Sequence, residues 1–147
     1  MNHSAKTFAK PVTSTAVVDT ANSTVNGTAI DTSGWDALLL ALVMGTKSDG
    51  TIAVKLQHSD ASGSGFADLA SPYDVLFTSV ADGAAGSATA QYTAINLRQT
   101  NVKRYVRSVI TVASNAGICN VGVVGFLVGP KDPTTQANTG WDKTLPS

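Results

Sequence analysis

The feature that most limits the fold of this chain is a pair of adjacent strand patterns between residues 37 and 59. The second pattern places Ile52, Val54 and Leu56 at every other position, and a period of two is typical of a strand with one face in a core and one near water. The first is a continuous apolar run, Ala37–Met44, which indicates a strand covered on both sides. The Asp-Gly pair at 49–50 predicts a hairpin turn between them. Two such strands cannot bury their apolar faces alone, so the rest of the chain must supply a second layer.

The rest of the chain carries further short strand patterns and no long helical stripe. All ten acidic residues are aspartate, which favours turns and caps over helix interiors. Over 104–113 the alternation assigns Val106 and Ile110 to the core and leaves Arg107 and Thr111 outward. With turn signals about every 8 to 12 residues, we predict an all-β chain of about eight strands, folded as an antiparallel sandwich or closed barrel. The other predicted strands span 14–19, 27–31, 73–80, 88–97 and 118–128.

The last predicted strand has two features of its own. Residues 114–117 before it predict another hairpin turn. Gly122, Gly125 and Gly129 interrupt the strand, which predicts a bulge or the close approach of a neighbouring backbone.

Both ends of the chain lack a strand pattern. We predict an N-terminal arm at residues 1–12, a β-sandwich domain at 13–129 and a C-terminal tail at 130–147, which holds three of the five prolines. A large indole such as Trp141 in a polar tail is expected to dock on its own domain or on a neighbour. The residues expected to bind a partner are Phe8, Pro130, Pro133 and Trp141.

The charge balance and the apolar runs exclude several classes of protein. Ten basic and ten acidic residues give a formal net charge of zero, whereas a nucleic-acid binder would show a basic patch or stripe. No apolar run approaches the roughly 20 residues of a membrane helix, and the amino terminus lacks the apolar core of a signal peptide. We therefore expect a protein made and folded in a cytoplasm, bound to neither nucleic acid nor membrane.

The titratable residues do not form a catalytic or metal-binding pattern. The two histidines are His3, in the arm, and His58, expected to be a hydrogen-bonded residue at a sheet edge rather than a base. A calcium site built by Asp49, Asp60 and Asp68 is one alternative, although no calcium-loop spacing is present and solvated turn aspartates are favoured. We expect no enzyme activity and no cofactor.

The aromatic residues leave one binding alternative open. Trp35 precedes the apolar strand and is expected to cap the sandwich core. The alternative is that Trp35 or Trp141 is a platform on which a sugar stacks, which would make the domain a carbohydrate-binding module.

Several segments in order along the chain carry a family resemblance. Together they resemble the small head proteins encoded near the major capsid gene of tailed bacteriophages, in particular jelly-roll decoration (cement) proteins. The resemblance covers about residues 14 to 133. The segments are Gly-Trp-Asp at 34–36, Gly-x-x-x-Asp-Gly-Thr at 45–51, Val-Lys-Leu-Gln-His-Ser-Asp at 54–60, Phe-Ala-Asp at 66–68, Lys-Arg-Tyr-Val-Arg at 103–107 and Val-Gly-Phe-Leu-Val-Gly at 124–129.

The resemblance implies a jelly-roll-like antiparallel β-sandwich and a mechanical function. Proteins of this family are commonly homotrimers that sit on the outside of the mature head, where they bridge neighbouring major capsid subunits. By bridging them, they stabilise the shell against the pressure of the packed DNA. The implied location is thus the capsid surface of the virion. The alternatives are another phage structural component on the same fold (tail, baseplate or head fibre) and the carbohydrate-binding module.

Overall fold

A computed structural model describes residues 9–20, 22–44, 51–70, 89–98, 101–113 and 119–130 of the chain. Every regular element in these ranges is a β-strand, so the all-β prediction is confirmed. Within the same ranges there is no helix with the length and apolarity needed to cross a membrane. The strands are β1 (Ala9–Thr20), β2 (Thr24–Asn26), β3 (Ile30–Asp31), β4 (Trp35–Met44), β5 (Thr51–Ser59), β6 (Ala67–Asp68), β7 (Thr89–Asn96), β8 (Tyr105–Ala113) and β9 (Cys119–Pro130).

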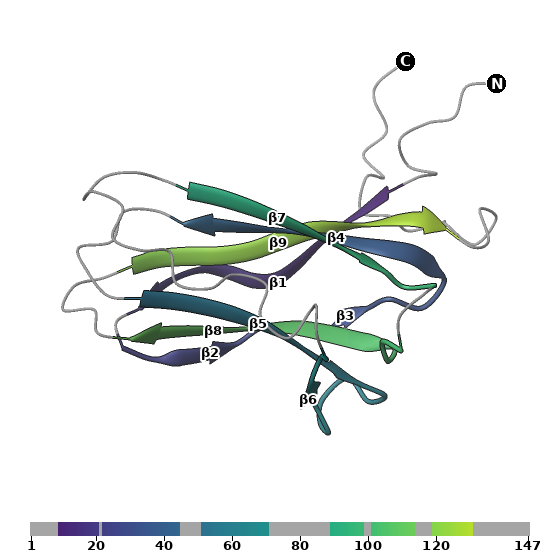
Figure 1. The fold of residues 1–147 in the computed structure, drawn as a ribbon, viewed down its shortest axis with the longest axis horizontal. Coiled ribbons are helices and arrows are strands. Elements are labelled where there is room, and N and C mark those ends of the chain that lie inside the picture. Colours follow the sequence, from purple (N-terminus) through teal and green to yellow (C-terminus); the bar gives the residue numbers. More distant parts are fainter. Residues whose placement is uncertain are drawn as a thin grey trace, which may run out of the picture.

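The strands form two antiparallel sheets that pack as a sandwich (Figure 1). One sheet has the order β1-β9-β4-β7, and the other has the order β2-β8-β5-β6 with β3 also paired to β8. Along the chain the first strand pairs with the last, β2 and β3 pair with β8, β4 with β7, and β5 with β6. This nested ribbon rolls up so that β9 meets β4 and β8 meets β5, which is the topology of a jelly roll.

The predicted hairpin between the two strand patterns at 37–59 is wrong. β4 and β5 lie in different sheets, because β4 already has β9 on one edge and β7 on the other. The predicted hairpin at 114–117 is wrong for the same reason, since β8 and β9 also belong to different sheets. Both connecting segments lie outside the described residues. An Asp-Gly pair indicates that the chain turns, but it does not determine which strands pair. β4 pairs instead with β7 and β9, which are far away in sequence.

The boundaries of the sandwich also differ from the prediction. β1 begins at Ala9, inside the predicted arm, and β9 continues to Pro130. Pro11 interrupts the sequence pattern but is tolerated because β1 is an edge strand, where a missing backbone N–H breaks no ladder. β2 lies between the strands predicted at 14–19 and 27–31, where no strand was predicted. The strand predicted at 73–80 falls outside the described residues.

The core lies between the two sheets. The alternating sets predicted to point inward from β5 and β8 are fully or almost fully buried. Trp35 is 6% exposed and belongs to the same cluster, as predicted for a residue that caps the core. The side chains that fill the centre include Leu38, Leu40, Leu42, Ile52, Val54, Leu56, Ile95, Val106, Ile110, Val121, Val123 and Leu127.

A buried cluster of hydroxyl groups fastens β1 to β8 across the sandwich. The register of β1 shifts between Thr13 and Thr15, and the two consecutive residues Ser14 and Thr15 are both buried. The Ser108 hydroxyl donates to Ser14 Oγ at 2.9 Å and lies 2.7 Å from Thr15 Oγ1, and the Ser108 N–H also donates to Ser14 Oγ at 2.8 Å. Gly27 closes the cluster, because its N–H donates to the Ser108 carbonyl at 2.8 Å. Each buried hydroxyl thus has a partner, as burial of polar groups requires.

Candidate functional site

Strand β4 is apolar on both of its faces, but the described chain covers only one of them. Leu38 and Leu42 point into the core and are 0% exposed. Leu39 and Val43, on the other face of the strand, are 40% and 44% exposed. The sequence predicted a strand covered on both sides, and β4 is flanked by neighbours on both edges. Its outer face is therefore the part of the prediction that the described chain does not satisfy.

The neighbouring strands continue this uncovered surface. On β9, Val124 and Phe126 are 38% and 43% exposed. The register places Phe126 directly beside Leu39, and Leu39 is flanked on its other side by Ala94 of β7. Residues directly opposite each other in a sheet project to the same side. We define the apolar face as six of the outward residues of these three strands: Leu39, Ala41, Val43, Ala94, Val124 and Phe126.

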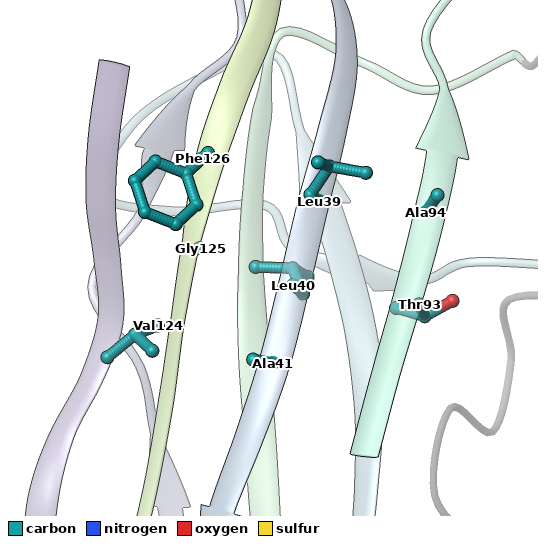
Figure 2. Close-up of a pocket in the computed structure, with 8 residues that line it drawn as sticks. All are labelled: Leu39, Leu40, Ala41, Thr93, Ala94, Val124, Gly125 and Phe126. Carbon is teal, nitrogen blue, oxygen red and sulfur yellow. The ribbon is translucent and has the colours of Figure 1, made fainter. Parts of the chain in front are cut away.

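The apolar face is hollowed between its larger side chains (Figure 2). The hollow has a volume of about 490 Å³. Phe126 and Val124 border it from β9, Leu39 from β4, and Ala94 from β7. The one polar side-chain atom among the labelled residues is the hydroxyl oxygen of Thr93. A surface of this kind can exclude water from an apolar partner but has almost nothing with which to orient a polar ligand.

Gly125 lies between the two protruding residues of β9 and confirms the predicted close approach of a neighbouring backbone. A Cβ built on Gly125 would collide with the carbonyl oxygen of Leu39 on the adjacent strand. Any side chain here would push β4 and β9 apart. Glycine therefore allows the two central strands to keep the register that sets Leu39 beside Phe126.

The outer face of the other sheet is polar and internally hydrogen-bonded. Lys55 Nζ donates to Asp68 Oδ2 at 2.9 Å, and Gln57 Nε2 donates to Asp68 Oδ1 at 2.8 Å. These bonds, that from Lys55 first, hold the pKa of Asp68 below its usual value. Arg107, which was predicted to point outward, donates through Nε and Nη2 to Gln57 Oε1 and lies over the ring of Phe66 at 4.1 Å. This face has its own partners and is suited to water.

Two further described ion pairs lie on the other sheet and its connecting segments, and a third, between Arg98 and Asp36, lies where β4 begins. Arg104 donates to both carboxylate oxygens of Asp31, at 3.0 and 2.7 Å, and this hydrogen bonding is the main cause that lowers the pKa of Asp31. Lys103 pairs with Asp60 at 2.8 Å. None of the six residues of the apolar face is charged. The two outer surfaces of the sandwich thus differ sharply in chemistry.

Of the residues predicted to bind a partner, Pro130 is the one that the structure describes. It is half-buried at the end of β9, opposite Trp35 of β4. Phe8, Pro133 and Trp141 lie outside the described residues. Because Ala9 at the start of β1 pairs with Val128 near the end of β9, the chain enters and leaves this sheet at the same end.

The described residues offer little support for the other candidate sites. Trp35 is too deeply buried to present a ring face to a sugar. His58 accepts a hydrogen bond at Nδ1 from the Lys103 backbone N–H at 3.3 Å, as predicted for a sheet-edge histidine. Asp60 and Asp68 each pair with a lysine, and Asp49 lies outside the described ranges. Among the residues that the structure describes, no three His, Cys, Asp or Glu side chains gather as metal ligands.

Sequence reasoning did not identify the apolar face as a site. The signal was present, because the unbroken run 37–44 already indicated two covered faces. The second covering layer was assigned to the rest of the same chain. Only the register and the exposed fractions show that Leu39, Val43 and Phe126 lack such a cover within the described residues.

Comparison with known proteins supports the fold. No protein-family model and no curated protein matches the chain. A chain in the structure of infectious bursal disease virus, Gt strain, is similar over 85% of this chain with a TM-score of 0.55 and 10% sequence identity. A chain in the structure of the Gx strain is similar over 85% of this chain with a TM-score of 0.47 and 13% identity. This protein spans about a third of the length of those virus chains. The likeness to the Gt strain chain is one of fold, a β-sandwich like that found in a virus particle.

Proposed function

We propose that this protein is a structural component of a virus particle, and specifically a decoration protein of a tailed-phage head. In this role it binds the outside of the mature head and bridges neighbouring major capsid subunits. Its action is mechanical, because each added contact between subunits must break before the shell can open. The proposed function requires no catalysis and no cofactor.

The observation that carries this proposal is the apolar face. An isolated soluble domain rarely leaves a contiguous apolar surface on the central strands of a sheet, and such surfaces commonly mark sites of macromolecular contact. In this chain, four large apolar residues are exposed together: Leu39, Val43, Val124 and Phe126. The outer face of the other sheet instead carries charged and amide side chains that hydrogen-bond to one another. This asymmetry suits a protein that works as part of an assembly.

Two further observations support a particle and a head location. The jelly-roll topology is shared with a chain in the structure of infectious bursal disease virus. Two of the sequence segments that resemble phage decoration proteins coincide with described strands, since 54–60 covers the second half of β5 and 103–107 covers the start of β8. A protein that binds the mature lattice and not the open one stabilises that lattice by mass action, as a ligand stabilises a native fold.

We propose that the chain segments flanking the sheet attach the protein to the shell. Phe8 precedes β1, and Pro133 and Trp141 follow β9 after Pro130. Because β1 begins where β9 ends, both segments leave the sandwich from one place. Two segments that start together can grip one junction between capsid subunits, and linked contacts bind more tightly than either alone.

The proposal is tested with heads of the phage that encodes the protein, prepared without it. Purified protein is added, the heads are pelleted, and release of DNA from the pellet is followed on heating. We expect the protein to pellet with the heads up to a fixed number of copies and to raise the temperature of DNA release. A protein that stays in the supernatant and is absent from infectious particles would remove the proposal. Electron microscopy that places it on the tail would instead favour a tail, baseplate or fibre component.

A further inference from the structure

The apolar face has the properties of a surface that is permanently covered. Its central strands β4 and β9 are apolar on both sides, in the way of strands buried within a sandwich. Surfaces that partners bind and release usually keep charged groups, whereas permanent homomeric interfaces are more apolar and depleted in charge. None of the residues that the register places on this side of β4, β7 and β9 is charged, which is the character of a permanent homomeric interface.

The size of the surface suits a stable contact between proteins. Pro11 and Val128 extend the apolar face onto the edge strand β1 and along β9, since Pro11 lies beside Phe126 in the register and Val128 beside Ala9. The outer surface of the whole sheet, four strands about 4.8 Å apart and roughly nine residues long at about 3.4 Å per residue, has an area of roughly 600 Å². Specific interfaces bury about 600 to 1,000 Å² on each partner. The outer surface of the whole sheet, with the apolar face at its centre, therefore reaches the lower end of this range.

The apolar face carries both large side chains and a hollow. The large side chains of Phe126 and Leu39 border the hollow, and the small residues Gly125, Ala41 and Ala94 line it beside them (Figure 2). A large side chain from a second copy could enter this hollow while its own hollow receives one in return. A two-fold homomeric contact requires a surface that carries both elements. Contact between two copies would also bury no charge, and the formal net charge of zero means that they do not repel each other strongly.

The family resemblance already implies a homo-oligomer, and we infer that the apolar face is the surface at which its copies meet, so that a second copy of this chain covers the β1-β9-β4-β7 sheet. This inference deepens the proposed function, because it assigns the face to self-assembly and leaves the flanking segments to hold the capsid. It rests on the proposed function only because the same apolar face is the observation that supports both proposals. Self-association is measured without any heads, so its failure is distinguishable from failure to bind a shell.

The test is sedimentation equilibrium of the full chain over a wide range of concentrations, repeated with charged variants. We expect the wild-type chain to be an oligomer. The double variant Leu39→Lys with Phe126→Lys should be monomeric, with self-association weakened at least a hundredfold. Ala53→Lys is the matched control, because Ala53 is an exposed strand residue on the outer face of the other sheet. It should associate like the wild-type chain.

Folding is checked by circular dichroism, and the single variant Val124→Thr serves if the double variant does not fold. Val124→Thr keeps the shape of the side chain and should weaken association measurably without a charge. A wild-type chain that remains monomeric at every concentration overturns the inference. A chain ending at Pro130 that associates when the full chain does not would show that the tail covers the face, and this too overturns it. Equal association of the wild-type chain and the double variant is the third contradicting result.

Discussion

Replacement of Gly27 by alanine tests whether the buried hydroxyl cluster holds the two sheets in place. A Cβ at this position would lie 2.5 Å from Ser14 Oγ, 2.6 Å from Thr15 Oγ1 and 2.7 Å from the Ser14 carbonyl oxygen. Unstrained nonbonded contacts lie near about 3.5 Å, so all three are too short. Overpacking of this kind costs about 1–3 kcal/mol. If Ser14 moves away, a hydrogen bond of the cluster is lost and a buried polar atom is left unsatisfied, at a further cost of about 1–3 kcal/mol.

We therefore expect Gly27→Ala to lower the free energy of unfolding by about 3 kcal/mol, which for a domain of this size lowers Tm by about 6–12 °C. Gly63→Ala is the matched control, because a Cβ added at Gly63 would have no heavy atom within 4 Å and neither glycine needs a left-handed φ. Thermal and urea unfolding followed by circular dichroism, at equal protein concentration, measure both variants. If Gly27→Ala is as stable as Gly63→Ala, the packing described for the cluster is incorrect.

The other predictions concern the sheet pairing, the pH dependence and the tail. Gly125→Ala should destabilise the fold by about 3 kcal/mol or more, because the collision is with the Leu39 backbone, which cannot rotate away; an unchanged urea midpoint would refute this. Because Arg104 lowers the pKa of Asp31 in the folded state, the Asp31 carboxylate stabilises the fold above about pH 4, and this contribution disappears as the pH falls through the lowered pKa. Asp31→Asn should then lose less stability than the wild-type chain on acidification, and an equal loss in urea titrations would count against the ion pair. Truncation after Pro133 should leave the sandwich folded but weaken attachment to heads in co-sedimentation, and equal affinity of the two forms would contradict that role for the tail.

The sequence predicted strands best where the two sides of a strand have different surroundings. On β5 and β8, one side faces the core and the other carries Lys55, Gln57 and Arg107, so the period of two is clear and the assigned faces are confirmed. β2 was missed because its three residues are mostly polar and exposed, and its pairing with β8 is the reason it is a strand at all. Short strands of this kind are made by their neighbours rather than by their own propensity.

Strand pairing could not be read from the turns. The Asp-Gly pair at 49–50 has the chemistry of a hairpin, yet β4 pairs with β7 and β9, which come much later in the chain. In a jelly roll most strands pair with distant partners, and the connection between successive strands often crosses from one sheet to the other. Local turn chemistry contains no information about that choice.

The sequence predicted the apolar character of the candidate site but not its exposure. The apolar run 37–44 correctly indicated that both sides of β4 are apolar, and Gly125 of β9 correctly indicated a close backbone approach. What could not be foreseen is which side stays uncovered. That depends on the register that brings Leu39, Ala94 and Phe126 together from three strands.

Electron cryomicroscopy of heads saturated with the protein tests the central claim most directly, namely that this sandwich is an adhesive part of a shell. The account predicts added density on the outside of the head, where capsid subunits meet, with the β1-β9-β4-β7 sheet turned toward a neighbouring copy and Phe126 buried. Heads that show no added density at saturating protein, or bound copies whose apolar face lies open to solvent, would contradict it.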